Sequence, residues 1–363
     1  MKIDGKEYSR KEIERRIGNI NQLGGTLHYQ FSEGRAKGVS GVEFNTGTGF
    51  SFTVIPDRGL DIAQCTYRGM NLVYHTPNGV VSPKFYEPGG FGWLRTFFAG
   101  LLATCGLTYF GPPGRDGDED LGLHGRYSTI PADKVCDLSR WDGDDYILEI
   151  TGVVEECVLF GDKLRLTRTI STGIGKKYLR IRDTVQNFGF KTSPFTILYH
   201  INAGFPLLDD GSELMLTSIE NVPYDEVSTS ALEDSARFTP PIPGFGEQNY
   251  LHTMAGDEKG FASAALINRN LLDGLGLYIR FHTGNLVYLS EWKMMGEGDY
   301  VLGLEPCNTK IDNRASLRKD NRLPVIEPGE IKEMEVEIGV LDGQEEIDKF
   351  SHRVKEITSS GSR

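Results

Sequence analysis

The sequence predicts a mainly β protein, an antiparallel β-sandwich with a short N-terminal helix, and three observations support this. Short runs of alternating apolar and polar residues recur along the chain from Thr26 onward, which is the period of a half-buried strand. The chain contains 44 Gly and 15 Tyr, a composition typical of strands joined by many turns. No helical pattern alternates with these runs, which disfavours a Rossmann fold or a TIM barrel.

Strands are predicted over 41–45, 49–55, 146–151, 164–170, 179–185, 195–200, 214–217, 277–281 and 334–340. Ahead of them, Ser9 and Glu12 have the spacing of a capping box, and apolar residues at helical spacing continue to Leu23, before two glycines. We therefore expect an N-terminal helical segment (1–25), a single β-sandwich domain (26–345) and a C-terminal tail (346–363). The Gly- and Pro-rich stretches 111–122 and 240–246 are predicted to be long loops, which often form the walls of an active site.

Composition excludes several classes of partner. The formal net charge is −12, from 51 acidic and 39 basic residues, and no Lys/Arg block is present, so nucleic acid is not expected to bind. No apolar run approaches the roughly 20 residues needed to span a membrane, and the N-terminus lacks the apolar core of a secretory signal. A cytoplasmic location follows as the expectation. The five cysteines form no C-x-x-C pair, so neither a metal site nor a redox centre is predicted.

His124 is the first residue that could carry chemistry. It lies in Leu121–Tyr127, after an acidic, Gly-rich stretch, and the flanking Gly125 leaves room for a ligand beside its ring. Arg126, two residues later, is a second candidate for binding. The structural alternative for His124 is a histidine that only forms hydrogen bonds at the start of a strand.

His200 ends the apolar run Phe195–His200 and is followed by Asn202 and a Gly/Pro loop. Alternation places Leu198 and His200 on one face of the strand, where a histidine at an open strand end is suited to general acid catalysis. A buried imidazole that bonds to the backbone is an equal alternative.

Glu305 is the single carboxylate of an otherwise apolar run that stops at Pro306. Burying a carboxylate costs several kcal/mol unless it is paired or has a function, and desolvation raises its pKa toward the range of a useful base. The alternative is a structural ion pair with an arginine such as Arg314.

Three further residues are candidates for substrate binding. Arg58 lies in a Pro/Gly turn, where its planar guanidinium could bind hydroxyls or a carboxylate, or form a salt bridge to Asp57 or Asp61. Trp292 could stack on a sugar ring or belong to the core. Lys293 follows it, and together with Arg58 it would suit an anionic ligand.

The set His124-Gly125-Arg126, His200 at a strand end and Glu305-Pro306 in an apolar strand resembles the galactose mutarotase (aldose 1-epimerase) superfamily, and more closely its DUF4432-type branch of aldose 1-epimerase-like proteins. The resemblance covers about 26–340 and implies the galactose mutarotase-like supersandwich fold. It implies Glu305 as the base on the anomeric hydroxyl and His200 as the acid on the ring oxygen, with no cofactor.

The same resemblance implies that His124, and with it Arg58, binds hydroxyls. Glu247 stands in for an aspartate of typical members, and Cys307-Asn308 replaces the glutamine that follows their Glu-Pro. Asn202, Glu247 and Asn308 are therefore also expected to bind the substrate. The expected function is anomer interconversion of a sugar, with an acidic or modified sugar as one possibility. A lyase or hydrolase on the same scaffold, and a non-catalytic carbohydrate-binding protein, stay open as alternative functions. The chain could also form a homodimer.

Overall fold

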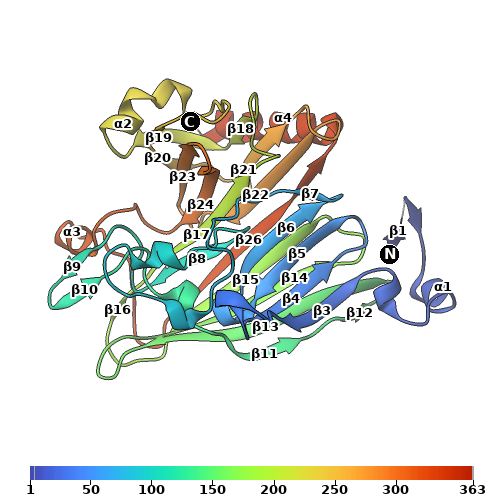
Figure 1. Ribbon diagram of the computed structural model, residues 1–363, viewed down its shortest axis with the longest axis horizontal. Coiled ribbons are helices and arrows are strands. Elements are labelled where there is room, and N and C mark those ends of the chain that lie inside the picture. Colours follow the sequence, from blue (N-terminus) through green and yellow to red (C-terminus); the bar gives the residue numbers. More distant parts are fainter. Residues whose placement is uncertain (4, 362–363) are drawn as a thin grey trace.

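The computed structural model describes residues 1–3 and 5–361, and its long strands pair antiparallel (Figure 1). The largest sheet has nine strands in the order β11-β13-β14-β15-β26-β22-β21-β18, with β12 paired to β13. Its strands are β11 (Asp133–Asp137), β12 (Arg140–Asp142), β13 (Asp145–Cys157), β14 (Lys163–Gly173), β15 (Tyr178–Asn187), β18 (Glu213–Leu216), β21 (Phe261–Asn268), β22 (Leu275–His282) and β26 (Ile331–Asp342).

Two smaller sheets lie against this one. The six-stranded sheet has the order β19-β20-β23-β24-β17-β8 and the five-stranded sheet the order β3-β4-β5-β6-β7. Their strands are β3 (Gly25–Gln30), β4 (Ser40–Asn45), β5 (Phe50–Ile55), β6 (Asp61–Tyr67), β7 (Met70–Asn71), β8 (Ala103–Leu107), β17 (Thr196–Gly204), β19 (Ser218–Pro223), β20 (Gln248–Met254), β23 (Tyr288–Met295) and β24 (Tyr300–Cys307). Bridges from Ile62 to Leu102 and from Val73 to Ala203 join the two sheets.

The core lies between the nine-stranded sheet and the other two. Along β13, β14 and β15 every second residue is buried, as the alternating sequence predicts, whereas β17 and β24 are buried on both faces. One face of β17 packs into the main core, and its other face is covered by a second apolar cluster that includes Trp93, Phe97 and Leu198. Residues on this covered face are therefore shielded from water.

The remaining elements are short, apart from one helix. Three two-stranded ribbons pair β1 (Lys2–Ile3) with β2 (Lys6–Glu7), β9 (Gly114–Asp116) with β10 (Glu119–Leu121), and β16 (Ser193–Pro194) with β25 (Val325–Ile326). The helices are α1 (Arg10–Glu14), α2 (Glu226–Ser230), α3 (Arg314–Lys319) and α4 (Gln344–Gly361). Single turns of 3₁₀ helix occur at Ile20–Gln22, Gly34–Ala36, Pro56–Arg58, Pro83–Phe85, Gly92–Arg95, Tyr127–Thr129 and Leu232–Asp234.

The structure confirms the predicted β fold and each predicted strand, but it corrects the N-terminal helix. The Ser9–Glu12 capping box is present, yet α1 has only five residues. Asn19 caps a separate 3₁₀ turn with Gln22, so local side-chain bonds compete with continuation of the helix. The stretch 111–122, predicted to be a loop, contains the β9–β10 ribbon.

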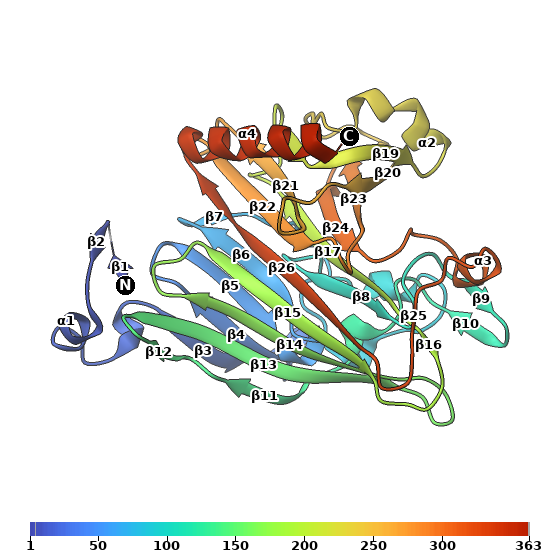
Figure 2. The ribbon, with the colours of Figure 1, turned by 180° about the vertical axis from the view of Figure 1, so that it is seen from behind.

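The C-terminal residues are helical. The segment predicted as a tail forms α4, which packs against β18, β22 and β26 (Figure 2). Within the described residues, no helix combines the length and the apolar character needed to cross a membrane.

Candidate functional site

His200 and Glu305 lie on adjacent strands of the six-stranded sheet. β17 and β24 pair antiparallel with Leu198 opposite Cys307 and Ile201 opposite Leu304, a register that makes His200 and Glu305 cross-strand neighbours. Nε2 of His200 lies 3.2 Å from Oε1 of Glu305. The two groups that the sequence analysis singled out are therefore in contact, side by side.

Both groups are almost completely buried, with side-chain exposures of 6% for His200 and 2% for Glu305. Burial raises the pKa of Glu305 to about 8, an effect that a hydrogen bond with Ser290 partly offsets. Burial, and then the neighbouring His124, lower the pKa of His200 well below its usual value. At neutral pH the pair thus holds one proton, which rests on the carboxyl group.

The pair retains unused hydrogen-bonding capacity. Within the described part of the chain, Nδ1 of His200 and Oε1 of Glu305 are buried and have no hydrogen-bond partner. The two groups are therefore in contact at 3.2 Å without the alignment of a hydrogen bond. Each of these atoms can therefore form a further hydrogen bond. The structural alternative of an ion pair between Glu305 and Arg314 is wrong, since Arg314 pairs with Asp116 and Glu119.

The pair lines a cavity of about 250 Å³ on the covered face of the sheet. Its apolar walls come mainly from the loops around it and consist of Phe91, Trp93, Leu94, Phe97, Pro112, Leu123, Trp292 and Ile311. Its polar lining consists of His124, His200, Tyr224, Glu247, Asn249 and Glu305. None of the described residues that line it is Lys or Arg. The cavity is small, below the range of about 300–1,000 Å³ typical of drug-sized ligands.

His124 reaches the cavity from a tight turn. Its φ is 58° and that of Gly125 is 75°, and a Cβ at Gly125 would lie 2.2 Å from the carbonyl oxygen of Tyr109, so only glycine fits there. The ring contacts the edge of Trp93 and lies 5.7 Å from the ring of His200, and Nδ1 is buried with no hydrogen-bond partner in the described structure. Burial lowers the pKa of His124 to about 4, so the ring is neutral and can bind a hydroxyl.

Trp292 and Glu247 form one side of the cavity. Nε1 of Trp292 donates a hydrogen bond of 3.1 Å to Oε2 of Glu247, and the indole meets the His200 ring at 78°. The register pairs Trp292 with Gly303 and Ser290 with Glu305, which places Trp292 and Glu305 on the same face of the sheet. The tryptophan thus stands beside the reactive pair.

Lys293 and Arg58 do not reach the cavity. Lys293 alternates to the opposite face of β23, where Nζ donates to the carbonyl oxygen of Asp234 at 2.8 Å. Arg58 is buried and donates to the carbonyl oxygens of Val81, Thr96 and Ser128. It forms neither of the salt bridges considered for it. Its bonds instead connect three loop segments, one of which carries Trp93 and Phe97 of the cavity wall.

Three other candidates also lie outside the cavity lining. The amide group of Asn202 donates to the carbonyl oxygens of Gly100 and His200. Asn308 ties β24 to β17, accepting from the backbone of Ile197 and donating to that of Phe195. Arg126 is exposed. Residues two or three positions away, His200, Glu305 and His124, line the cavity, whereas Asn202 and Asn308 bond to backbone atoms and Arg126 faces the solvent.

Several lining residues were missed by the sequence analysis. Trp93 lies in a 3₁₀ turn and Phe97 in the loop after it, Tyr224 follows the edge strand β19, and Asn249 lies on the adjacent strand β20. The run 89–97, rich in Gly and aromatic residues, was an indication of a further ligand-facing loop, besides the predicted loop 111–122, whose Pro112 lines the cavity. Among the described residues, no three or more His, Cys, Asp or Glu side chains gather in a way that could hold a metal ion.

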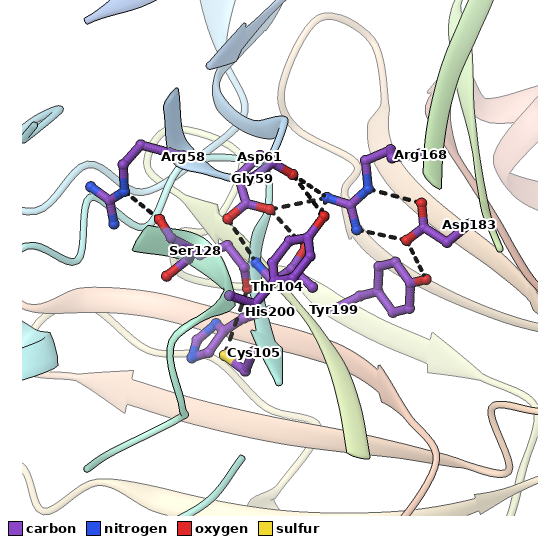
Figure 3. Close-up of polar contacts among 12 residues, drawn as sticks. Arg58, Gly59, Asp61, Thr104, Cys105, Ser128, Arg168, Asp183, Tyr199 and His200 are labelled. Atoms are coloured by element: carbon purple, nitrogen blue, oxygen red, sulfur yellow. Dashed lines mark hydrogen bonds and ion pairs between the residues drawn. The ribbon is translucent and has the colours of Figure 1, made fainter. Parts of the chain in front are cut away.

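A network of buried charged residues lies on the face of β17 opposite His200 (Figure 3). Arg168 donates two hydrogen bonds to Asp183, at 2.9 and 2.7 Å, and further bonds to Asp61 and Thr104. The hydroxyl of Tyr199, the residue before His200, donates to Asp183 at 2.7 Å. The network thus joins the nine-stranded sheet to β17 and β8 directly beneath the reactive pair.

Comparison with known proteins gives one family and one fold. The model of the family described as "Domain of unknown function (DUF4432)" matches residues 36–340. A crystal structure of a candidate aldose 1-epimerase from Klebsiella pneumoniae superposes with a TM-score of 0.87 at 21% identity, covering 98% of this chain and 96% of that one. No curated protein matches the sequence.

Two more distant structures share the fold. A galactose mutarotase-like protein from Clostridium acetobutylicum has a TM-score of 0.61 at 13% identity, over 89% of this chain and all of that one. Galactose 1-epimerase from Lactobacillus acidophilus has a TM-score of 0.55 at 13% identity, over 88% of this chain and 99% of that one. The chain therefore has the galactose mutarotase-like fold that the sequence predicted.

Proposed function

The chain belongs to the DUF4432 family and has the galactose mutarotase-like fold, and from this premise we propose that it is an aldose 1-epimerase-like isomerase that interconverts the anomers of a sugar. The observation that carries the proposal is the contact between His200 and Glu305 on the floor of one small cavity. A buried acid/base pair with perturbed pKa values in a cleft is characteristic of a site of proton transfer.

The reaction needs two proton transfers close together. O1 and O5 of a cyclic aldose are bonded to the same carbon, so the groups that serve them must lie side by side, as His200 and Glu305 do. Glu305 takes the proton from O1 while His200 gives one to O5; the C1–O5 bond breaks and the C1–O1 carbonyl forms. Rotation about C1–C2 presents the other face of the carbonyl, and ring closure with the roles reversed gives the other anomer.

These roles require the single proton of the pair to be on His200 when the sugar reacts. The raised pKa of Glu305 places this proton on the carboxyl group, and the separation of 3.2 Å allows it to pass to the imidazole. Because the two groups are coupled, they titrate as a pair. The neutral ring of His124 and the side chains of Glu247 and Asn249, which also line the cavity, form hydrogen bonds with the other hydroxyl groups of the sugar.

The pH profile follows from this proton count. The active form carries one proton, which is lost as the pH rises through about 8, the raised pKa of Glu305. We expect kcat/KM to be flat near neutrality and to fall tenfold per pH unit above about 8. Polarimetry on a freshly dissolved anomer, corrected for the uncatalysed rate, measures it. A rate that increases through pH 8 would show that the pair works without its proton and would contradict the scheme.

A methyl group at Gly303 should disable the site while the fold persists. A Cβ there would lie 2.5 Å from Oε1 of Glu305 and 3.0 Å from Cβ of Trp292, so the carboxyl group must move. Displacement of a reacting group by about 1 Å can cost 10²-fold, and we expect a loss of that order in kcat for Gly303→Ala. Gly89→Ala is the control, since nothing lies within 4 Å of its Cβ. Wild-type activity in Gly303→Ala would place the chemistry elsewhere.

Exchange NMR tests the function itself. Saturation of one anomeric proton is transferred to the other anomer only if the two interconvert, so a panel of neutral and acidic aldoses identifies both activity and substrate. Acceleration for at least one aldose is expected. If no aldose responds, the lyase, hydrolase and binding alternatives replace the isomerase. Glycosides of the same neutral and acidic sugars then distinguish these alternatives, since a lyase would produce an alkene proton, a hydrolase a cleaved glycoside, and a binding protein neither.

A further inference from the structure

A second cavity lies on the other face of the six-stranded sheet. It has a volume of about 630 Å³ and is lined mainly by residues of β18, β19, β20, β23 and α4. His252 and Glu291 line it, whereas Asn249 and Trp292, on the same two strands, line the first cavity, which contains His200 and Glu305. Side chains alternate along a strand, so the two cavities lie on opposite faces of β20 and β23. The proposed sugar reaction uses no residue of the second cavity.

A buried histidine–carboxylate pair lines the second cavity. Nε2 of His252 lies 2.9 Å from Oε2 of Glu291, and the two side chains are 4% and 0% exposed. Nδ1 of His252 lies 3.1 Å from Oγ of Ser218. Both ring nitrogen atoms therefore have a partner, which fixes the orientation of the imidazole and, through it, that of the carboxylate.

Two buried acceptor atoms beside this pair have no partner. Within the part of the chain that the structure describes, Oε1 of Glu291 and Oδ1 of Asn221 are buried and form no hydrogen bond. Asn221 lines the same cavity and lies directly opposite His252 in the pairing of β19 with β20, so its side chain is on the same face of the sheet. A molecule that bonds to these two oxygen atoms must supply the donors.

The carboxylate of Glu291 also lacks a lysine or arginine partner. Among the described residues its one ion-pair contact is with His252. Nζ of Lys293, two residues along the same face of β23, donates to the carbonyl oxygen of Asp234 at 2.8 Å. Arg269, which lines the cavity, pairs instead with Glu213 and Asp348. Because a charged donor bonds to a carboxylate more strongly than a neutral one, a cationic ligand suits the free oxygen atom best.

The free atoms favour an ammonium group over other cations. A guanidinium binds a carboxylate through both of its oxygen atoms, and Oε2 of Glu291 is already occupied by His252. An ammonium group carries three donors that can reach separate acceptors. Among the described residues, no three His, Cys, Asp or Glu side chains gather to hold a metal ion. Leu214, Leu216 and Val354 supply apolar surface for the carbon chain of an amine.

The geometry points to a second ligand site, which binds a small organic amine through its primary ammonium group. Glu291 and Asn221 accept from the ammonium, and His252 positions the carboxylate. The cavity volume of about 630 Å³ is within the range of about 300–1,000 Å³ typical of small-molecule sites. The inference does not depend on the proposed isomerase function, since it concerns other residues on the other face of the sheet.

Isothermal titration calorimetry with three probes of equal chain length tests the site. The probes are butylamine, 1-butanol and butylguanidine, at a pH near 7 where the amine is protonated. We expect butylamine to bind one site, with a Kd lower than that of either other probe by about tenfold or more. No binding of butylamine, or equal or tighter binding of 1-butanol or butylguanidine, would overturn the proposal.

Variants locate the binding in the second cavity. Glu291→Gln keeps the shape of the side chain but removes its charge, and Asn221→Ala removes the second acceptor, so each should raise the Kd of butylamine by about tenfold or more. Glu220→Gln, at the exposed position before Asn221, is the matched control and should keep the wild-type Kd, as should Glu305→Gln in the first cavity.

Circular dichroism verifies that each variant is folded. If Glu291→Gln does not fold, Asn221→Ala decides, because Asn221 is only half-buried and lies on the edge strand β19. A Kd that is unchanged in the folded site variants, or that rises in Glu305→Gln instead, would place the amine elsewhere and overturn the assignment.

Discussion

Replacement of Glu305 by Gln is expected to lower kcat for anomer interconversion about 10²- to 10⁴-fold, with a much smaller change in KM. The amide keeps the shape of the side chain but can neither accept nor return the proton of O1, and a positioned acid or base contributes a factor of that size. Exchange NMR measures kcat directly. Glu333→Gln, at an exposed position of β26, is the matched control.

The stability of the variant shows whether such a loss is chemical. The pKa of Glu305 is raised by folding, so the stability associated with its proton is present below the unfolded pKa and is lost as the pH rises through about 8. Gln cannot ionise and avoids this loss. Glu305→Gln should therefore unfold at no lower a temperature than the wild type at pH 9. An inactive variant with a clearly lower Tm at that pH would mean that Glu305 acts structurally, and unchanged kcat would exclude it as the base.

The largest effect on stability is expected for Arg168→Met. Its guanidinium is fully buried between Asp61 and Asp183, and removing one partner of a buried ion pair costs about 3–5 kcal/mol because the remaining charge is left without compensation. Burial already raises the pKa of Asp61 to about 7 with Arg168 present, which shows how poorly this position tolerates a lone carboxylate. Urea unfolding followed by tryptophan fluorescence measures the change in free energy.

Arg182→Met provides the matched control for this measurement. Arg182 lies on the next strand, β15, with 64% of its side chain exposed, and approaches Glu335 only to 3.8 Å. A surface pair of this kind contributes little, so we expect a change within about 0.5 kcal/mol. If both variants lost the same small amount, the Arg168 network would not be what fastens β17 and β8 to the nine-stranded sheet.

The alternating pattern of the sequence was sufficient for the fold class and for the nine strands predicted from it, but it did not reveal others such as β3, β6, β20 and β21. A period of two with frequent turns leaves few options besides an antiparallel sandwich, and the pattern fixes which residues of β13, β14 and β15 are buried. It also made His200 and Glu305 candidates for a functional site, because an ionisable residue in an apolar strand differs from its neighbours. The alternation within a strand and the presence of an ionisable residue in it depend only on the sequence of that strand, so both can be recognised without the rest of the chain.

Only the tertiary structure decided which residues form the cavity. Whether His200 meets Glu305 depends on the pairing of β17 with β24, and Trp93 and Phe97 lie about 100 residues before His200 and about 200 before Glu305 in the chain. Arg58 and Lys293 were predicted as ligands of an anion because their charge suits that role. The fold instead turns both toward backbone carbonyl groups, since a buried cation is stabilised by whichever acceptors surround it, and sequence spacing does not specify those acceptors.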